Sequence, residues 1–199
     1  FMEANYSSLK TVCLRPGDIF GEGDPFHIDA LLSMAKKNMY IRIGDGTAKS
    51  QHVYVGNIAH AHLLAASAVL KGNEKPCGKV YFITDGEPSN FFLFFDDILR
   101  RAGYQLKPEN VWLPAWFMYL LGTLNEFIAF LVRPFFRYNP NVSRFAVTYT
   151  CSEFTFSSKK AKEDFGFAPF YTEEEALQNT ALYYRAASAE EEMPSYNSR

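Results

Sequence analysis

Few side chains in this 199-residue sequence are spaced for metal binding. His60 and His62 stand two residues apart in a predicted helix. At that spacing they point about 200° apart around the helix axis, so they cannot share a metal ion. The two other histidines, His27 and His52, are isolated in the sequence. We therefore expect all four to be ordinary core or surface residues and predict no metal ligand.

The cysteines and the paired carboxylates are no better placed for catalysis. Cys13, Cys77 and Cys151 are far apart and form no Cys-x-x-Cys motif, which excludes a disulfide scaffold or a zinc site and favours reduced structural thiols. Asp96 and Asp97 are adjacent in a predicted helix, so their side chains point in different directions. We expect both carboxylates to lie on the solvated surface.

The strongest candidate for a ligand-binding loop is the segment Arg15-Pro-Gly-Asp-Ile-Phe-Gly-Glu-Gly-Asp24. It follows a short apolar strand and runs into the start of a helix. Ligands of open α/β sheets bind beyond the carboxyl ends of the strands, which is where this loop begins. The alternative is that its glycines and proline only form a turn.

Strands and helices that alternate along the chain must position this loop. The apolar patterns predict extended segments at residues 10–14, 40–43, 52–55 and 79–83, and helices at residues 25–37, 58–70, 90–102, 158–165 and 172–187. Asp24 and Asn57 are the expected N-caps of the first two helices, and Thr172 with Glu175 forms a capping box for the last. This alternation predicts an α/β fold with a largely parallel sheet.

An aromatic, apolar stretch separates the last two helices from the rest. Residues 113–132 contain no Lys or Arg, which approaches the length of a bilayer span. Asn125 and Glu126 lie in its middle, where a charge is costly in lipid. A helix in the membrane interface, or one folded across a hydrophobic pocket, fits better than a span. An ordinary buried helix is the alternative.

The overall composition narrows the possible partners. The 20 Lys and Arg nearly balance the 22 Asp and Glu, and the net charge of −2 argues against nucleic-acid binding. With 48% apolar and 21% charged residues, the chain is a folded globular protein rather than a disordered one. We expect disorder only in the polar tail, residues 188–199.

Five motifs together resemble the 3β-hydroxysteroid dehydrogenase/Δ5-Δ4 isomerase family of extended short-chain dehydrogenases. They are Cys13-Leu-Arg-Pro-Gly-Asp-Ile-Phe-Gly-Glu-Gly23, His52-Val-Tyr-Val-Gly-Asn-Ile-Ala-His-Ala-His62, the stretch from Met118-Tyr to Leu131-Val-Arg-Pro134, Phe154-Thr-Phe-Ser-Ser-Lys-Lys-Ala161 and Pro169-Phe-Tyr-Thr-Glu-Glu-Glu-Ala176. Each motif alone is weak. Their order and spacing from about residue 9 to residue 184 make the resemblance specific.

The resemblance implies NAD-dependent oxidation of a steroid 3β-hydroxyl, followed in many members by Δ5-Δ4 isomerisation, with NADP as an alternative cofactor. It implies the fold of the C-terminal part of a Rossmann-like extended short-chain dehydrogenase, including the substrate-binding region. The expected cofactor-binding residues are Leu14, Arg15, Pro16 and Gly17. The expected substrate-binding residues are Ile19, Phe20, Phe26 and Tyr119.

No catalytic residue is assigned within the chain. The family's Gly-x-x-Gly-x-x-Gly turn is not found at the start of the sequence. Tyr6 and Lys10 have the four-residue spacing of the family's catalytic Tyr-Lys pair, but Tyr6 is only nine residues before Arg15. The family places the rest of a helix, a loop and a strand in that interval. We therefore predict that this pair is a chance match and that the chain is a fragment beginning after the true pair.

The resemblance also suggests four segments and several partners. Residues 1–110 are expected to hold the end of the NAD-binding sheet with interleaved substrate-binding elements, 111–138 a membrane-associated or pocket-covering segment, 139–187 a C-terminal substrate region and 188–199 the tail. The implied partners are a steroid or sterol, a membrane surface and a second copy in a homodimer. The endoplasmic reticulum membrane is the implied location, with the mitochondrial membrane as an alternative.

Other functions remain open at this point. A sterol-4-carboxylate 3-dehydrogenase and a sugar-nucleotide epimerase use the same fold, although the epimerase needs cationic groups for a diphosphate. A non-catalytic, membrane-associated lipid-binding protein is the alternative outside the enzymes.

Overall fold

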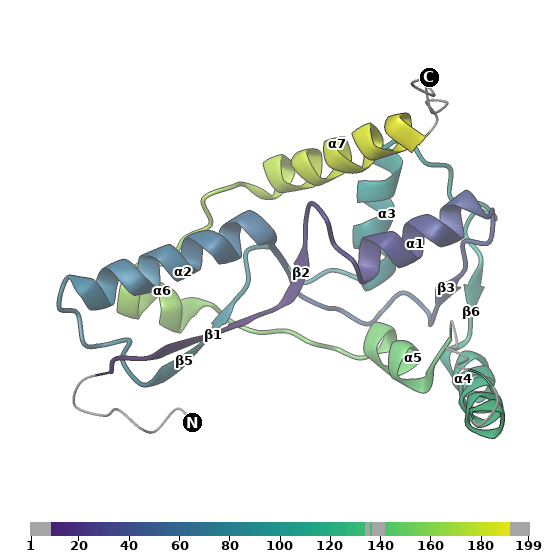
Figure 1. The fold of residues 1–199 in the computed structure, drawn as a ribbon, viewed down its shortest axis with the longest axis horizontal. Helices are drawn as coiled ribbons and strands as arrows, with labels where there is room; N and C mark the ends of the chain where they lie inside the picture. Colours follow the sequence, from purple (N-terminus) through teal and green to yellow (C-terminus); the bar gives the residue numbers. More distant parts are fainter. Residues whose placement is uncertain (1–8, 134–135, 137–141, 192–199) are drawn as a thin grey trace, which may run out of the picture.

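The computed structural model describes residues 9–133, 136 and 142–191, with side chains described as far as residue 185. The predicted alternation of strands and helices is confirmed (Figure 1). The strands are β1 (Val12–Pro16), β2 (Asp18–Phe20), β3 (Arg42–Ile43), β4 (His52–Tyr54), β5 (Lys79–Ile83) and β6 (Trp112–Leu113). The helices are α1 (His27–Lys36), α2 (Val55–Leu70), α3 (Phe91–Arg101), α4 (Ala115–Val132), α5 (Arg144–Cys151), α6 (Lys159–Phe165) and α7 (Glu173–Glu191). Tyr6 and residues 192–199 lie outside the described residues.

All three strand pairs in the described residues are parallel, as expected. β1 pairs with β5, β2 with β4, and β3 with β6. Two backbone hydrogen bonds hold the short connection between β1 of the first pair and β2 of the second. The Gly17 N–H donates to the Ile83 carbonyl, and the Asp18 N–H donates to the Gln51 carbonyl, each at 2.9 Å. The carboxyl ends of β1 and β5 therefore meet beside the start of β2.

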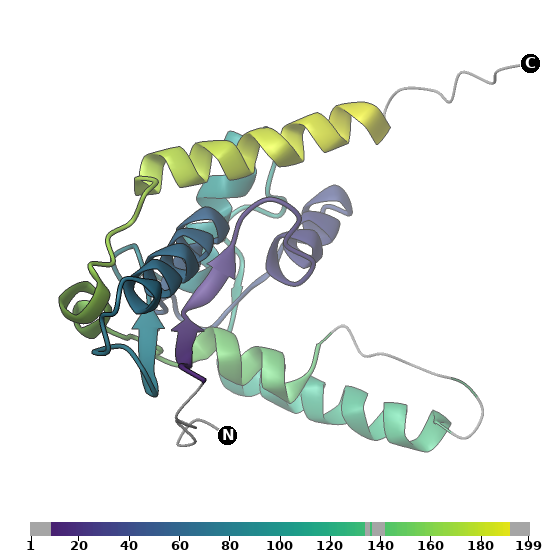
Figure 2. The same cartoon turned by 60° about the vertical axis from the view of Figure 1, so that its left-hand side comes forward.

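Helices cover the strands in two groups, each with its own apolar core. α2 and α6 pack beside β1 and β5, while α1, α3 and α7 surround the other core (Figures 1 and 2). α4 and α5 lie side by side in both views, at the end of the molecule away from α2 (Figures 1 and 2). The first core consists of Val53, Ile58, Ala61, Ala65, Tyr81, Ile83, Ala161, Phe165 and Phe167. The second is rich in aromatic residues, including Phe20, Tyr40, Tyr54, Phe91, Phe92, Phe95 and Tyr184.

The predicted capping contacts of Asp24 and Thr172 are present, although α1 begins at His27, two residues after the expected start. The Asp24 carboxylate accepts hydrogen bonds from the backbone N–H groups of Phe26, His27 and Ile28. Thr172 and Glu175 exchange the two reciprocal bonds of a capping box. These contacts satisfy N–H groups that have no partner inside the helix.

The expected role of Asn57 as a helix N-cap is wrong. α2 begins at Val55, so Asn57 lies inside the first turn, where its side chain is buried. Its amide donates to the Asp85 carboxylate at 2.6 Å and to the Tyr171 carbonyl, and its oxygen accepts from the Phe170 and Tyr171 N–H groups. Asn57 therefore links three distant segments of the chain.

Two element ends also differ from expectation. β1 begins at Val12 rather than Lys10, whose ammonium instead pairs with Glu74 at 3.0 Å. α7 continues to Glu191, beyond the expected end near residue 187. The helix thus includes the first residues of the segment that we expected to be disordered.

Candidate functional site at the ends of the strands

The carboxyl end of β1 carries the four residues expected to contact the cofactor. In the ladder, Leu14 lies opposite Tyr81, Arg15 opposite Phe82 and Pro16 opposite Ile83. The Arg15 side chain is exposed, and Leu14 and Pro16 are half-buried. The structure thus places these residues at the sheet edge where ligands of α/β proteins bind. Their contact with a cofactor stays a prediction.

Gly17 allows the chain to turn from β1 into β2 at close quarters. A Cβ atom built on Gly17 would lie 2.5 Å from the Gln51 carbonyl oxygen and 3.2 Å from the Thr84 methyl carbon. Any larger residue would push these segments apart, so this position requires glycine for packing. The side of Gly17 that lacks a side chain is occupied by Gln51 and Thr84, so this glycine serves the packing of β1 against its neighbours.

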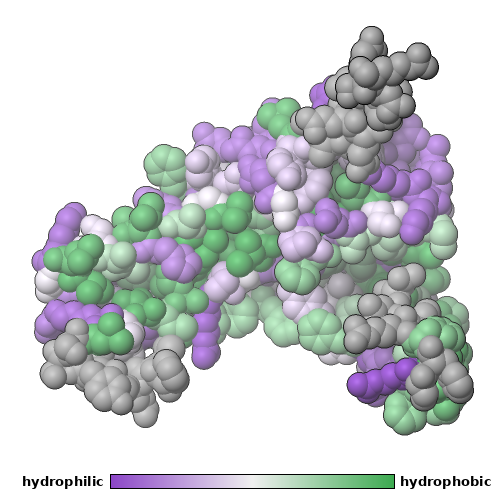
Figure 3. All heavy atoms as spheres, in the orientation of Figure 1, coloured by the Kyte–Doolittle hydropathy of each residue, from purple (hydrophilic) through white to green (hydrophobic). Residues whose placement is uncertain are grey.

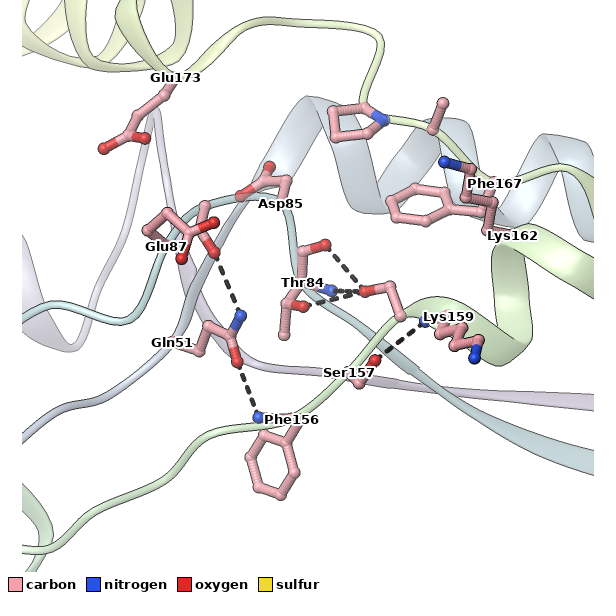
Figure 4. Close-up of a pocket in the computed structure, with 14 residues that line it drawn as sticks. Gln51, Thr84, Asp85, Glu87, Phe156, Ser157, Lys159, Lys162, Phe167 and Glu173 are labelled. Atoms are coloured by element: carbon pink, nitrogen blue, oxygen red, sulfur yellow. Dashed lines mark hydrogen bonds between the residues drawn. The ribbon is translucent and has the colours of Figure 1, made fainter.

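A cavity of about 440 Å³ opens beside the end of β5 (Figure 4). Thr84, Asp85 and Gly86 form one wall, and α6 with the segment before it forms another. The Gln51 amide donates to the Gly86 carbonyl and accepts from the Phe156 N–H, while the Ser158 hydroxyl bonds to both the backbone and the side chain of Thr84. The cavity is lined by opposite charges. Lys159 and Lys162 lie on α6, and Glu87 and Glu173 lie on the other side of the cavity.

Asp85 is the lining residue of this cavity with a perturbed pKa. Burial raises the pKa of the carboxyl group, and the hydrogen bonds from Asn57 and from the Tyr54 N–H offset only part of that effect. Because both partners come from β4 and α2, Asp85 fastens the end of β5 to those elements.

The four expected substrate-binding residues do not converge on one point. Ile19 is exposed on β2, whereas Phe20 is buried in the aromatic core against Tyr54 and Phe94. Phe26 is exposed just before α1. Tyr119 lies on α4, close to Arg144 of α5. Their role in substrate binding therefore stays a prediction, with Phe20 placed in the core.

A polar cluster that no local sequence pattern predicts surrounds the buried side chain of Asp18. The Tyr149 hydroxyl donates to Asp18 Oδ1 at 2.8 Å. His27 Nε2 lies 3.4 Å from the same oxygen, and His52 Nδ1 lies 3.4 Å from Oδ2. His27 and His52 are isolated in the sequence, but the fold brings both to the Asp18 carboxylate, and the pairing of β2 with β4 sets His52 opposite Asp18. We name Asp18, His27, His52 and Tyr149 the Asp18 cluster.

His27 is the member of the Asp18 cluster that lies between two carboxylates. Its Nδ1 is 3.6 Å from Asp24. Burial alone lowers the pKa of the imidazole, but the close contact with the Asp24 carboxylate and the negative charges of Asp18 and Asp24 raise its pKa overall. The same contact, with the backbone N–H donors of α1, holds the pKa of Asp24 below its usual value despite the burial that opposes it.

Ser50, together with His52 and Asp18 of the Asp18 cluster, resembles a Ser-His-Asp triad in its order of contacts. Ser50 Oγ lies 3.3 Å from His52 Nε2, whose other nitrogen faces Asp18. Ser50 and His52 are buried, the His52 ring is stacked on Phe94 at 3.9 Å, and Ser50 does not line the cavity beside β5. A nucleophile needs access to its substrate, so this arrangement does not indicate a hydrolase. No cluster of three or more His, Cys, Asp or Glu among the described residues is arranged to hold a metal ion.

Asp96 is not on the surface, contrary to expectation. Its carboxylate accepts two bonds from the Arg42 guanidinium, at 2.8 and 2.6 Å, and one from the Tyr40 hydroxyl at 2.7 Å. Arg42 is 1% exposed. α3 places Asp96 on its inner face beside Phe95, whereas Asp97 is solvent-exposed and pairs with Arg101. Arg42 is therefore committed to an internal ion pair.

α4 is the helix in the described residues that is long and apolar enough to cross a membrane, by length and composition. Its 18 residues have a mean hydropathy of 1.5, and 11% of them are buried. The alternative of an ordinary buried helix is thus not supported within the described chain. In Figure 3, hydrophobic side chains gather where Figure 1 places α4. The exposed apolar residues are Trp116, Phe117, Leu120, Leu124, Phe127, Ile128, Phe130 and Leu131.

α4 contacts α5 through its small and polar residues. Gly122 allows close approach, because a Cβ there would lie 2.9 Å from the Arg144 nitrogen. Glu126 accepts bonds from the Arg144 N–H and guanidinium. These hydrogen bonds keep the pKa of Glu126 below its usual value.

Comparison with solved structures identifies the fold. The protein gox2253 is 24% identical, with a TM-score of 0.60, and the match covers 92% of this chain and 51% of that one. UDP-glucose 4-epimerase from Thermotoga maritima, solved with UDP-glucose, is 22% identical, with a TM-score of 0.56 and coverage of 90% and 47%. RMD from Pseudomonas aeruginosa, complexed with NADPH, is 15% identical, with a TM-score of 0.55 and coverage of 90% and 49%. The chain spans about half the length of the structures it matches.

The parallel strand pairs, their helix cover and these likenesses define a Rossmann-like α/β fold. The model of the 3-beta hydroxysteroid dehydrogenase/isomerase family matches residues 2–114, more than half of the chain. The chain belongs to that family, which confirms the family indicated by the sequence motifs.

Proposed function

We propose that this chain forms the substrate side of a nicotinamide-dependent enzyme that oxidises the 3β-hydroxyl group of a steroid or sterol. The observation that carries the proposal is the family match, because it includes the loop that leaves β1 and all of β5. In the proposed reaction, bound NAD accepts the hydride from C3 of the substrate. NADP is the alternative cofactor, and isomerisation of the double bond is a further step of the same proposal.

The residues of this chain would act on cofactor and substrate by packing rather than by proton transfer. Leu14, Arg15, Pro16 and Gly17 would cover the nicotinamide end of the cofactor at the carboxyl edge of β1. The position of these residues supports this role, because they stand at the carboxyl end of β1, beside the end of β5. The catalytic tyrosine and lysine would come from a part of the enzyme that precedes this strand.

We also propose that α4 lies in a membrane interface, at the endoplasmic reticulum or, alternatively, at a mitochondrial membrane. The exposed apolar face of α4 supports attachment to lipid. The ion pair between Glu126 and Arg144 at 2.6 Å supports a helix covered by protein on one side rather than a free span. Since steroids partition into lipid, the same surface would bring the substrate to the enzyme.

A sugar nucleotide is less well supported as the substrate. Binding a diphosphate requires cationic side chains that are free to reach it. Arg42 is paired with Asp96 in the core and Arg144 with Glu126, so neither guanidinium is free to bind a diphosphate, although Lys159 and Lys162 line the cavity beside β5. The aromatic, apolar surface of α4 instead favours a lipid-like substrate. A sterol-4-carboxylate remains within the proposed class because it keeps the sterol skeleton.

A substrate panel tests the proposal. The full-length protein, in membranes and with NAD or NADP, would be given a 3β-hydroxy-Δ5 steroid, a 4-carboxysterol, UDP-glucose and, as a matched control, the 3α-hydroxy epimer of the steroid. We expect reduced nicotinamide to appear with a 3β-hydroxy substrate and not with the 3α epimer. Turnover of UDP-glucose alone, or binding of sterol with no turnover, would contradict the proposal and favour an epimerase or a non-catalytic lipid-binding protein.

A further inference from the structure

Asp18 belongs to two parts of the molecule at once. It follows directly after the strand-end residues 14–17, and its backbone N–H is bonded to the Gln51 carbonyl. Its carboxylate is bonded to Tyr149, which lies 131 positions further along the chain, on α5. The Asp18 side chain is 5% exposed, so the carboxylate end of this contact is buried, while Tyr149 is half-buried. A hydrogen bond to a buried carboxylate is stronger than one between neutral groups.

α5 lies between α4 and the strands (Figures 1 and 2). On one side it packs against α4 through Gly122 and the Glu126–Arg144 ion pair. On the other side, the Tyr149 ring is parallel to the His27 ring, with centroids 6.0 Å apart. α5 also packs against β3, and Tyr149 is the residue of α5 that bonds to β2.

We propose that the hydrogen bond from Tyr149 to Asp18 positions the α4/α5 helix pair against the strand end. Tyr149 and Asp18 are thus positioning residues for substrate binding. The substrate part of this inference rests on the proposed function. A substrate delivered at α4 must reach the end of β1, and α5 is the element between the two. Fixing α5 therefore fixes the substrate side of the site.

The cofactor side does not use this hydrogen bond. The strand end is held by backbone contacts, from the Gly17 N–H to Ile83 and from the Asp18 N–H to Gln51. A change in the side chain of Asp18 or Tyr149 leaves both bonds in place. The inference thus predicts a change in substrate affinity without a change in NAD affinity, whereas a general loss of structure would alter both.

The kinetic test uses Tyr149→Phe in the full-length enzyme. We expect KM for the steroid to rise about tenfold, the loss of about 1.4 kcal/mol of binding, while kcat and the Kd for NAD stay within about twofold. The matched control is Tyr81→Phe, which also removes a tyrosine-to-carboxylate hydrogen bond, from β5 to Asp164 of α6 at 2.6 Å, and should leave KM for the steroid unchanged. An unchanged KM in Tyr149→Phe, or equal changes in steroid and NAD affinity, would overturn the inference.

A conservative variant separates positioning from folding. In Asp18→Asn the side-chain oxygen can still accept from the Tyr149 hydroxyl, so we expect KM within about threefold of the wild-type value. Asp18→Ala removes the acceptor, so its KM should match that of Tyr149→Phe. If Asp18→Asn and Asp18→Ala raised KM equally, the inference would fail.

Hydrogen exchange of α5 gives a readout that is independent of catalysis. In Tyr149→Phe, the backbone amides of Arg144–Cys151 should exchange about tenfold faster than in the wild type, while those of β1 and β5 stay unchanged. Unaltered exchange in α5 would contradict the positioning role even in an active enzyme. If the protein turns over no steroid but α5 is released as expected, the proposed substrate is wrong and the positioning role of the hydrogen bond stands.

Discussion

His27 shows how one side chain acquires a pH-dependent role from residues that are near it only in the folded protein. Asp18 on β2 and Asp24 before α1 face the imidazole, and the Tyr149 ring from α5 lies against it. On the side of α3, the imidazole contacts only the uncharged rings of Phe91 and Phe95. The pKa of His27 is raised by the two carboxylates, which outweigh the opposing effect of burial.

The raised pKa of His27 predicts that stability depends on pH. A group with a raised pKa in the folded state stabilises the protein fully below its unfolded value of 6.5, and this contribution is lost as pH rises through the folded pKa. We expect His27→Gln to reduce the free energy of unfolding at about pH 6 more than at about pH 8. Urea unfolding across this range measures it. His60→Gln is the control, because His60 faces the Phe170 ring rather than a carboxylate, and a constant effect of His27→Gln would contradict the assignment.

Arg42 and Asp96 predict a large effect of a single substitution. Removing one partner of a buried ion pair leaves the other charge without compensation, at a cost of about 3–5 kcal/mol. We expect this loss in Arg42→Met, and only about 1 kcal/mol or less in Asp97→Asn, because the pair of Asp97 with Arg101 is exposed. Urea unfolding measures both. The double variant Arg42→Met with Asp96→Leu should recover most of the loss, and a loss below about 1 kcal/mol in Arg42→Met would refute the prediction.

At the scale of elements, local patterns in the sequence predicted most of the helices and strands. The run Lys79–Ile83 is the observed β5, and the capping box at Thr172 begins α7 as expected. These signals lie within a few residues of the element that they define. Asn57 was misread because its partners are Asp85 and residues 170–171, which no local pattern brings near it.

The site was less predictable than the fold for the same reason. The strand-end loop could be found from the sequence, because its signal is the local order of strand, turn and helix. The Asp18 cluster could not, since Asp18, His52 and Tyr149 are joined only by strand pairing and by the packing of α5. The sequence does contain one indication, because Asp18 is a carboxylate in an otherwise apolar strand. It does not indicate which residues contact that carboxylate.

The exposed apolar face of α4 predicts that this helix attaches the protein to membranes. If its apolar face binds the membrane interface, replacing Leu120, Leu124 and Phe127 with serine should release the full-length protein from vesicles, because each exposed apolar Å² withdrawn from water contributes about 25 cal/mol. Vesicle sedimentation measures this. Leu63→Ser with Leu70→Ser is the matched control, since both leucines are exposed on α2. Equal release by both sets, or no release by the α4 set, would contradict the interfacial placement.

At the scale of the whole molecule, the chain corresponds to about half the length of the proteins whose fold it shares. It supplies the parallel strand end, the close turn at Gly17 and the helix pair α4/α5 beside it. The family match and these elements support the proposal that this half of the enzyme holds the substrate. Hydride transfer from the 3β-hydroxyl carbon is the central claim of that proposal.

The most direct test follows the hydride itself. The full-length enzyme would be incubated with NAD and a 3β-hydroxysteroid that carries deuterium at C3, and the nicotinamide product would be examined by mass spectrometry. The proposed function predicts that one deuterium per turnover appears in the reduced nicotinamide and that the steroid becomes a 3-ketone. Formation of the ketone without deuterium in the cofactor, or no ketone while a sugar nucleotide is turned over, would contradict it.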